Sequence, residues 1–415
     1  MPTPLSAERA GELSLEASRV FSPSAPIDDR ALFAGRIEQV RQVIDVINQK
    51  GQHAIIFGDR GVGKTSLANV LASFLPQGTS AFSQRINCDE GDSFNSVWHK
   101  VFSEVQYQEV TKVGGFSNQS QRPRADADAD IISPDVVRRQ LTQWSSKTVL
   151  PILIIDEFDR VGEDYRSIFA DTIKTLSDHA VSATVILVGV ADSVEHLISG
   201  HESVQRALVQ IKMPRMSKEE IEEIVNKGLS RLGMHIAPEA LNHIVVLAQG
   251  LPHYAHLLAL HASRAALDRE SRNVDVKALD VAIRKAIEEA QQSIRTAWHK
   301  AVQSPRKDNL FSDVLLACAL ATTDDLGTFA AQDVRTPMRE ITSKTYDIPS
   351  FAQHLNEFSS DKRGNILKKL GSTRRFRFRF VNPLMPPFVI MRGFAEGKIK
   401  SSLLERKINE ARKLF

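Results

Sequence analysis

Short apolar runs recur through the first half of the chain and are separated by amphipathic stretches. The runs at 54–57, 149–155 and 184–189 are each long enough for a buried strand, and residues 83–88 fit a further one. From Arg36 to about Lys50 the apolar residues repeat at helical spacing, and Gly51 ends that pattern. Strands that alternate with helices in this way predict an α/β fold built on a parallel sheet.

The pattern changes after residues 213–214, and the next part of the chain is almost entirely helical in character. Ser217 and Glu220 form a capping box for the first helix, and 274–302 reads as one long helical stretch. The last part of the chain predicts three more helices and then a hairpin, which is the element order of a winged helix. These helices are expected at 310–321, 330–341 and 350–358, with the hairpin turn at 371–372.

The run at 54–57 ends in a glycine-rich loop with the spacing G-x-x-x-x-G-K-[ST], and a helical pattern follows it. Glycine lets the backbone curl around a polyphosphate where a Cβ would obstruct it. The N–H groups of the loop and the positive end of the helix then face the anion. We expect Lys64 to neutralise the β- and γ-phosphates and the Thr65 hydroxyl to hold Mg²⁺. The residues expected to bind ATP here are Gly58, Asp59, Arg60, Gly61, Val62, Gly63, Lys64, Thr65 and Ser66.

Two adjacent carboxylates follow the apolar run at 149–155. A buried strand would carry Asp156 to its C-terminal tip, the edge at which ligands bind in open α/β sheets. We expect Asp156 to bind Mg²⁺ through water and Glu157 to polarise the water that attacks the γ-phosphate. Such a pair is also compatible with a simple strand-end turn, but after a phosphate-binding loop it indicates nucleotide hydrolysis.

Two further polar residues are placed near the ends of the remaining strands. Asp192 follows the run at 184–189, where it can contact the γ-phosphate or the lytic water, or cap the next helix. Arg206 precedes the last strand of the predicted sheet, where an arginine can reach the γ-phosphate of a neighbouring subunit or simply lie on the surface. Both alternatives stay open for both residues.

Residues 30 to about 300 resemble an AAA+ ATPase of the initiator type, the origin-recognition and Cdc-six-like proteins. They also resemble the related STAND signalling NTPases, because the turn at 250–253 reads Gly-Leu-Pro-His, the Gly-x-Pro form of that group. The resemblance implies the fold class of a P-loop NTPase core with a parallel sheet, followed by an α-helical lid. The implied domains are an N-terminal arm (1–29), the ATPase core (30–213), the lid (214–304), a winged helix (305–395) and a basic C-terminal helix (396–415).

The same resemblance implies roles for single residues. The segment that contains Arg36 would lie against the adenine, although the residues alone fit a hydrophobic lead-in to the first strand equally well. Pro252 and His253 would contact the nucleotide from the lid. Asp192 stands where the related proteins usually have Asn or a hydroxyl residue, so a slow switch fits as well as a motor. Arg206 matches the arginine finger, which implies an ATP-dependent homo-oligomer.

The strand after the predicted hairpin turn alternates phenylalanine with arginine, so its outward face is basic. Concentrated positive charge on a hairpin is the expected footprint of contacts with DNA phosphates. A solvated edge strand protected by charge is the alternative, and phosphate contacts would carry no base preference. The residues expected to bind double-stranded DNA are Lys368, Lys369, Arg374, Arg375, Arg377 and Arg379. The basic helix at 396–415 is open to partner docking or to simple packing.

Composition argues against a polycationic protein, a secreted protein and a membrane protein. The net charge is only +3, so any nucleic-acid surface must come from local clustering rather than from the chain as a whole. Two cysteines without metal-type spacing, and an N-terminal stretch without an apolar h-region, predict a reduced cytoplasmic protein. The longest apolar runs are too short to span a bilayer, so no membrane contact is expected.

These patterns together predict a switch that binds and hydrolyses ATP with Mg²⁺ and binds DNA through a winged helix. By its resemblance to initiators, it would recruit or load a partner protein. The alternative is a STAND-type signalling ATPase, for example in defence or stress response, whose winged helix contacts protein instead of DNA. The interpretation as a processive motor is less well supported, because no further motor motif follows the lid.

Overall fold

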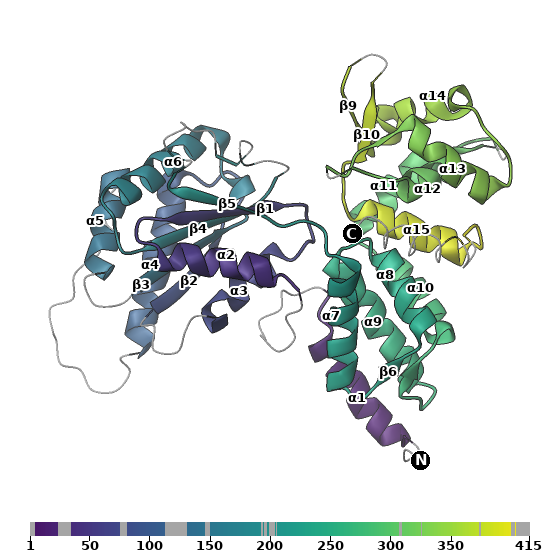
Figure 1. Cartoon of the computed structure of the whole chain (residues 1–415), viewed down its shortest axis with the longest axis horizontal. Coiled ribbons are helices and arrows are strands. Elements are labelled where there is room, and N and C mark those ends of the chain that lie inside the picture. Colours follow the sequence, from purple (N-terminus) through teal and green to yellow (C-terminus); the bar gives the residue numbers. More distant parts are fainter. Residues whose placement is uncertain are drawn as a thin grey trace. The chain divides into compact units, whose positions relative to one another are not determined.

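The computed structural model divides the chain into two compact units (Figure 1). The sheet unit contains Pro26–Asp59 and Gly63–Pro214, and the helical unit contains Met1–Ala25, Arg60–Val62 and Arg215–Phe415. The residues that the structure describes are 5–23, 35–74, 81–112, 131–145, 150–191, 194, 197–198, 204, 206–306, 309–324, 326–372, 375–399 and 403. Asp192 and Arg374 lie outside them.

A five-stranded parallel sheet forms the centre of the sheet unit, with strand order β2-β3-β4-β1-β5. The strands are β1 (His53–Gly58), β2 (Ala81–Asn87), β3 (Leu150–Asp156), β4 (Thr184–Val190) and β5 (Leu208–Lys212). The inner strands are buried on both faces, which explains why they read as continuous apolar runs rather than as alternating ones. This sheet confirms the predicted α/β fold class.

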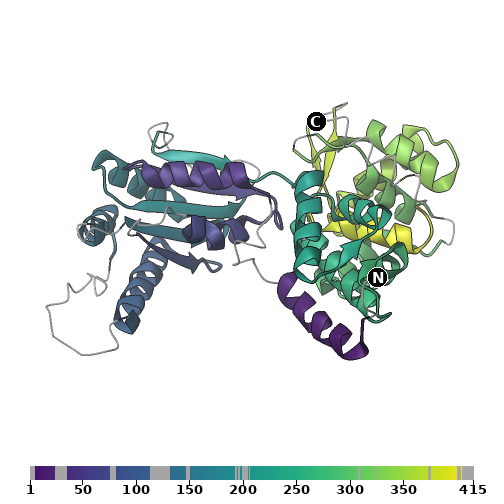
Figure 2. The ribbon, with the colours of Figure 1, turned by 60° about the horizontal axis from the view of Figure 1, so that its bottom comes forward.

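Helices cover both faces of this sheet (Figure 2). On one face, Trp98, Phe102, Trp144 and Phe169 pack with strand residues such as Leu153 in one apolar core. The opposite face carries the two helices that flank β1. The helices of this unit are α2 (Ile37–Asn48), α3 (Lys64–Phe74), α4 (Phe94–Lys112), α5 (Pro134–Ser145), α6 (Glu163–Asp178) and the 3₁₀ turn η2 (Phe158–Arg160).

The last segment of the helical unit, which starts at Arg215, begins with five helices in the place predicted for a lid. They are α7 (Lys218–Arg231), α8 (Pro238–Ala248), α9 (Pro252–Leu267), α10 (Val276–Glu288) and α11 (Gln292–Val302), with a short parallel pair of β6 (His235–Ile236) and β7 (Asn273–Val274). The predicted capping box is present, because Ser217 accepts from the Glu220 N–H and Glu220 accepts from the Ser217 N–H. The predicted long helix is wrong, since Gln291 takes an extended ψ of 139° and separates α10 from α11.

The predicted N-terminal arm is, over residues 5–23, a packed part of the helical unit rather than a separate arm. Helix α1 (Ala7–Val20) starts at a Ser6 cap and packs on α9 and α7. Leu13, Ala17 and Val20 on one of its faces are buried, and Phe21 after it is fully buried. The burial of this apolar face holds the helix in place. The helix therefore belongs to the helical unit.

Gly228 in α7 provides the space into which the Phe21 ring fits. A Cβ on Gly228 would lie 2.3 Å from Phe21 Cε1, so any larger residue must displace the ring. We expect Gly228→Ala to destabilise the protein by about 1–3 kcal/mol, because overpacking costs more than the helix gains from alanine. Gly11→Ala is the matched control, since no heavy atom lies within 4 Å of its added Cβ. Urea unfolding measures the free energy of unfolding of both variants. Equal values would contradict the packing of the Phe21 ring against Gly228.

Among its described residues, the last part of the helical unit has three helices, a hairpin and a further helix after it. The helices are α12 (Phe311–Leu320), α13 (Ala331–Thr342), α14 (Ile348–Phe358) and α15 (Met385–Ala395), with η5 (Asp361–Arg363) between α14 and the hairpin. The strands β8 (Phe329–Ala330), β9 (Leu367–Leu370) and β10 (Arg377–Phe380) form an antiparallel sheet in the order β8-β10-β9. The element order agrees with the predicted one, and α15 is an addition to it.

Two phenylalanine side chains of β10 face the protein interior. Phe378 and Phe380 are buried, and their rings lie 6.1 and 6.3 Å from the ring of Phe329. This core fixes the strand register, so the alternate positions face outward. In the part of the chain that the structure describes, no helix combines the length and the apolar character that crossing a bilayer requires.

Candidate nucleotide site and basic hairpin

The glycine-rich loop joins the end of β1 to the start of α3. Gly58 and Gly63 have φ values of 153° and 95°, which residues with a Cβ rarely adopt. A Cβ on Gly58 would also lie 2.4 Å from the Met213 carbonyl oxygen. The loop thus requires glycine at these points, and it forms the glycine-lined cradle that a polyphosphate needs.

Lys64 is buried within this loop. Its Nζ donates hydrogen bonds to the carbonyl oxygens of Gly58, at 2.9 Å, and of Asp59, at 2.7 Å. Only 8% of the residue is exposed. The loop carbonyls therefore hold the ammonium group at the N-terminus of α3, where an anion is also stabilised by the helix. Thr65 and Ser66 follow in the first turn of this helix.

The two predicted carboxylates of β3 lie in different environments. Asp156 is 3% exposed, and its Oδ1 accepts the Glu157 N–H at 2.8 Å. Its Oδ2 lies 3.9 Å from Nη1 of Arg85, which also donates to Oδ1 of Asn69 in α3. Glu157 takes a left-handed φ of 55°, an uncommon conformation for a residue with a side chain. Its carboxylate is half-exposed and lies 3.4 Å from Nη1 of Arg160.

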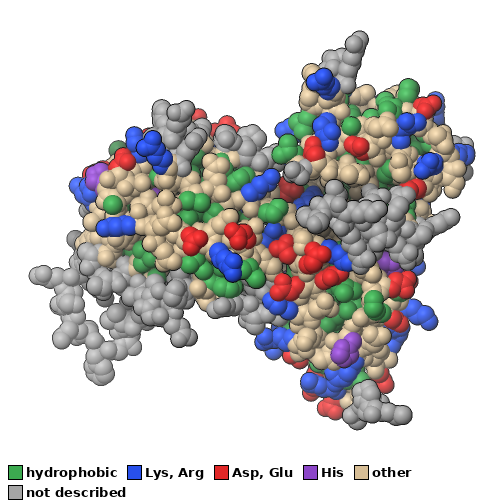
Figure 3. Space-filling view, viewed as in Figure 1, with side chains coloured by type: hydrophobic (Ala, Val, Ile, Leu, Met, Phe, Trp, Pro, Cys, Tyr) green, Lys and Arg blue, Asp and Glu red, His purple; other side chains and the backbone are tan. Residues whose placement is uncertain are grey.

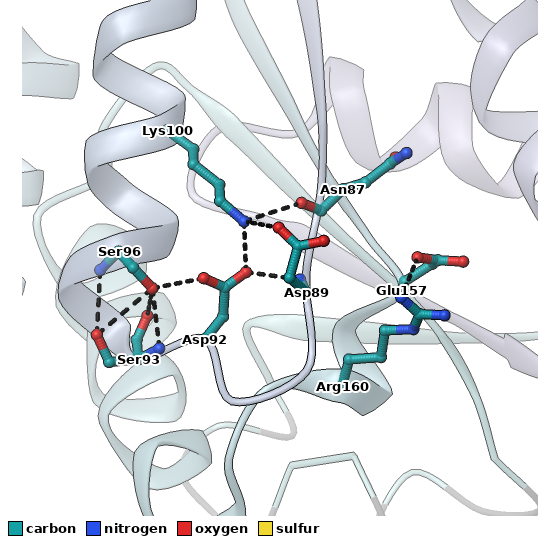
Figure 4. A network of polar contacts seen from close by, with 8 residues as sticks. All are labelled: Asn87, Asp89, Asp92, Ser93, Ser96, Lys100, Glu157 and Arg160. Atoms are coloured by element: carbon teal, nitrogen blue, oxygen red, sulfur yellow. Dashed lines mark hydrogen bonds and ion pairs between the residues drawn. The ribbon is translucent and has the colours of Figure 1, made fainter.

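A polar network that the sequence did not reveal lies beside this pair, at the end of β2 (Figure 4). Nζ of Lys100 lies 2.6 Å from one carboxylate oxygen of Asp89 and 2.6 Å from one of Asp92. Burial alone would raise the pKa of Asp92, but hydrogen bonds from the Asp89 N–H, Lys100 and Ser96 lower it. Asn87 pairs with Asp156 in the sheet, so the network and the carboxylate pair share one edge. The only signal for it was the spacing of Asp92 and Ser96 at a helix start.

The exits of β3 and β4 are joined by a side-chain hydrogen bond. Asp159 Oδ1 accepts the N–H of Val190, the last residue of β4, at 2.7 Å. The predicted contact of Asp192 cannot be placed, because that residue lies outside the described part of the chain. Arg206 is exposed in the turn before β5, a position that agrees with either of its predicted roles. Its role as an arginine finger stays a prediction.

The Arg36 side chain makes a hydrogen bond inside the sheet unit. It is 3% exposed, begins α2 with a left-handed φ of 60°, and donates from Nη2 to the Pro214 carbonyl oxygen at 2.5 Å. This bond joins the start of α2 to the segment that leaves β5. The Arg36 guanidinium thus makes a hydrogen bond within the protein. The predicted contact of this segment with adenine stays a prediction.

The Gly-x-Pro turn of the helical unit is held by a main-chain hydrogen bond. Gly250 has a φ of 70°, and its carbonyl oxygen accepts the Met216 N–H at 2.8 Å. Pro252 is buried and begins α9. Nδ1 of His253 lies 2.7 Å from the Pro23 carbonyl oxygen, so this nitrogen carries the proton. Burial lowers the pKa of His253, and the bond to Pro23 opposes that shift. The predicted contacts of Pro252 and His253 with nucleotide stay predictions.

The basic residues of the hairpin divide into two groups. Lys368 and Arg375 are exposed, and Arg379 pairs with Lys368 on the outward face. Lys369 instead pairs with Phe378 on the aromatic face, where its Nζ bonds Asn356 Oδ1 at 2.7 Å. Figure 3 shows lysine and arginine side chains on this hairpin.

Arg377 is engaged with the protein itself. Its Nη2 lies 3.0 Å from Asp324 Oδ2 and donates to the Thr328 carbonyl oxygen at 2.8 Å. The alternating sequence does not reveal that Arg377 is held by contacts within the protein. Arg374 lies outside the described residues.

Comparison with known proteins identifies the family. A family model described as Novel STAND NTPase 1 matches residues 25–358. The chain belongs to this family of STAND NTPases. This confirms the STAND resemblance that was predicted from the Gly-x-Pro turn and the phosphate-binding loop. No curated protein matches the sequence.

Two solved structures resemble this STAND NTPase in fold. One is the Walker-type ATPase paby2304 of Pyrococcus abyssi, with a TM-score of 0.54 and 15% identity over 89% of this chain and 99% of that chain. The other is the ORC2 protein of Aeropyrum pernix in ADPNP-ADP complexes, with a TM-score of 0.50 and 14% identity over 94% of this chain and 98% of that chain. At these identities the likeness concerns the fold alone, and it agrees with the predicted P-loop core with a parallel sheet.

Proposed function

We propose that this STAND NTPase binds ATP with Mg²⁺ in the loop at 58–66 and hydrolyses it. The observation that carries the proposal is the placement of Lys64, whose ammonium is held by loop carbonyls at the N-terminus of α3. The cradle and the carboxylate at the tip of β3 fit a nucleotide and its cation, because they combine backbone donors, one lysine and oxygen ligands. The related ORC2 protein was solved in ADPNP-ADP complexes, which supports the same ligand class here.

Each residue of the proposed site has a separate task. Lys64 would transfer its hydrogen bonds from the loop carbonyls to phosphate oxygens, and Thr65 and Asp156 would hold Mg²⁺. The cation would neutralise charge on the phosphates. Glu157 would orient and deprotonate the attacking water, since its carboxylate is the more exposed of the pair. We further propose that Arg206 completes the site of a neighbouring copy in an ATP-dependent oligomer.

We propose that the nucleotide cycle controls binding of double-stranded DNA by the hairpin, and through it the recruitment of a partner protein. The exposed cations Lys368 and Arg375, with Arg379 beside them, support contact with a phosphate backbone. The buried aromatic face supports a structural role for the phenylalanines, so base stacking is not part of the proposal.

Replacing Lys368, Arg375 and Arg379 together with alanine is expected to weaken duplex binding and to reduce its salt dependence. Each lost phosphate contact lowers the slope of log K against log salt by about one unit. Gel shifts of the full chain over a range of salt concentrations measure this. Lys277, Arg284 and Lys285, the exposed cations of α10, provide the matched triple-alanine control. Absence of duplex binding by the unmodified protein at low salt would refute DNA contact and favour a winged helix that contacts protein.

A further inference from the structure

The first turn of α9 binds main-chain carbonyls from two distant parts of the helical unit. Nδ1 of His253 donates to the carbonyl oxygen of Pro23, three residues after the end of α1. The next residue, Tyr254, donates from its hydroxyl to the carbonyl oxygen of Leu384 at 2.7 Å. Two adjacent side chains therefore join the start of α9 to both an N-terminal and a C-terminal element.

The Tyr254 hydroxyl is buried, and Leu384 is its partner. The residue is 2% exposed, and burial raises the pKa of the phenol, so it stays protonated and donates. A buried hydroxyl of this kind strongly prefers one orientation, because losing its partner is costly. Leu384 is the N-cap of α15, so the bond fixes the position at which α15 begins.

Leu384 is in turn connected to the basic hairpin. Its N–H donates to Asn382 Oδ1 at 3.0 Å, and the Val381 N–H donates to the Ile366 carbonyl oxygen at 3.0 Å. Val381 directly follows Phe380, the last residue of β10. Hydrogen bonds thus run from the first turn of α9 to the base of β9 and β10, with only a short segment of chain between them.

On the other side, Tyr254 is close in sequence to the Gly-x-Pro turn, which packs closely against the segment before α7 and continues into α9 through Pro252. A Cβ on Gly250 would lie 2.7 Å from the Met216 carbonyl oxygen, and Pro252 fixes its own φ at the start of the helix. A displacement of this turn is therefore expected to move the first turn of α9 as one body, and the Tyr254 hydroxyl with it.

We propose that Tyr254 couples the Gly-x-Pro turn to the basic hairpin, so that the bound nucleotide sets the affinity of the hairpin for DNA. This inference rests on the proposed function and names its means of regulation. Tyr254 is a positioning residue, because it acts through Leu384 and the start of α15. Chains of hydrogen bonds and rigid helices carry coupling of this kind, and only measured coupling establishes it.

The test compares Tyr254→Phe, which removes only the hydroxyl, with Tyr165→Phe, a control on the partly exposed Tyr165 of α6. Duplex affinity of the full chain is measured with a non-hydrolysable ATP analogue and with ADP. We expect the two affinities to differ by roughly tenfold in the unmodified protein and in the control. In Tyr254→Phe this ratio is expected to approach one, while nucleotide affinity without DNA changes less than about twofold. Thermodynamic linkage makes this coupling reciprocal. Duplex DNA must therefore change the affinity for the ATP analogue, relative to that for ADP, by the same factor.

Hydrogen exchange without any ligand gives a second readout that does not depend on the proposed function. The amides of Val381, Asn382, Leu384 and Met385 are expected to exchange several-fold faster in Tyr254→Phe than in the unmodified protein and the control. If the unmodified protein binds neither nucleotide nor DNA, the proposed function fails, and unchanged exchange would then also reject the coupling bond. If it binds both and Tyr254→Phe keeps the full affinity ratio, only the coupling proposal is overturned.

Discussion

Replacing Lys64 with alanine is expected to lower ATP affinity by at least about 100-fold while the protein stays folded. Hydrogen bonds to charged groups contribute about 1.5–3 kcal/mol each, so losing a lysine that contacts two phosphates accounts for such a decrease. The fold is expected to persist, because the hydrogen bonds from Nζ to the Gly58 and Asp59 carbonyls hold the loop and are not part of the sheet. Titration calorimetry with Mg²⁺ and ATP measures the affinity.

The matched control for this experiment is Lys174→Ala, which removes an exposed lysine from α6 in the same unit. Its ATP affinity is expected to equal that of the unmodified protein. Thermal unfolding of both variants without nucleotide separates a loss of binding from a loss of structure. Unchanged ATP affinity in a folded Lys64→Ala variant would place the nucleotide site elsewhere in the chain.

Replacing Glu157 with glutamine is expected to keep ATP binding and to slow hydrolysis by roughly 10²–10⁴-fold. Glutamine preserves the volume and the left-handed turn position, but it cannot accept a proton from the attacking water. The nearby Asp156 is a poor substitute as base, because it is buried and its Oδ1 accepts the N–H of Glu157. Phosphate release in a single turnover measures the effect, and calorimetry measures the retained affinity.

Glu163→Gln is the control for this variant, since Glu163 is an acidic residue at the start of α6 whose side chain is 90% exposed. It is expected to hydrolyse ATP at the unmodified rate. Turnover that persists in Glu157→Gln would assign the base to another residue. The carboxylates of the network at the end of β2 would then be the next to test, because they share the same sheet edge.

The nucleotide loop, the parallel sheet and the family could be predicted because their signals are local. The spacing from Gly58 to Thr65 encodes the backbone shape of the loop, and the apolar run before it encodes a buried strand. The Gly-x-Pro turn pointed to the STAND family for the same reason. These motifs describe chain conformation over a few residues, so no distant contact is needed to recognise them.

The features that sequence reasoning missed depend on distant partners. Helix α1 has small apolar residues such as Ala10 and Ala17 on its buried face. This face can be recognised as buried only once its packing partners α7 and α9 are known. Helix α15 begins with two prolines, which suggest a break but fit the first turn of a helix. The ion pair between Arg377 and Asp324 joins the hairpin to a segment about fifty residues earlier. The alternation of phenylalanine and arginine within the strand could not predict such a distant contact.

The place of α1 also constrains the order in which the protein can fold. The sheet unit is inserted between α1 and the rest of the helical unit, because Pro26–Asp59 and Gly63–Pro214 lie between them in the chain. During synthesis α1 therefore leaves the ribosome long before α7 and α9 exist, and its apolar face has no partner in the meantime. The inserted domain is able to acquire its structure first, since domains generally fold as units from the N-terminus. We expect the helical unit to mature last, through a contact of high sequence separation, which is slow to form.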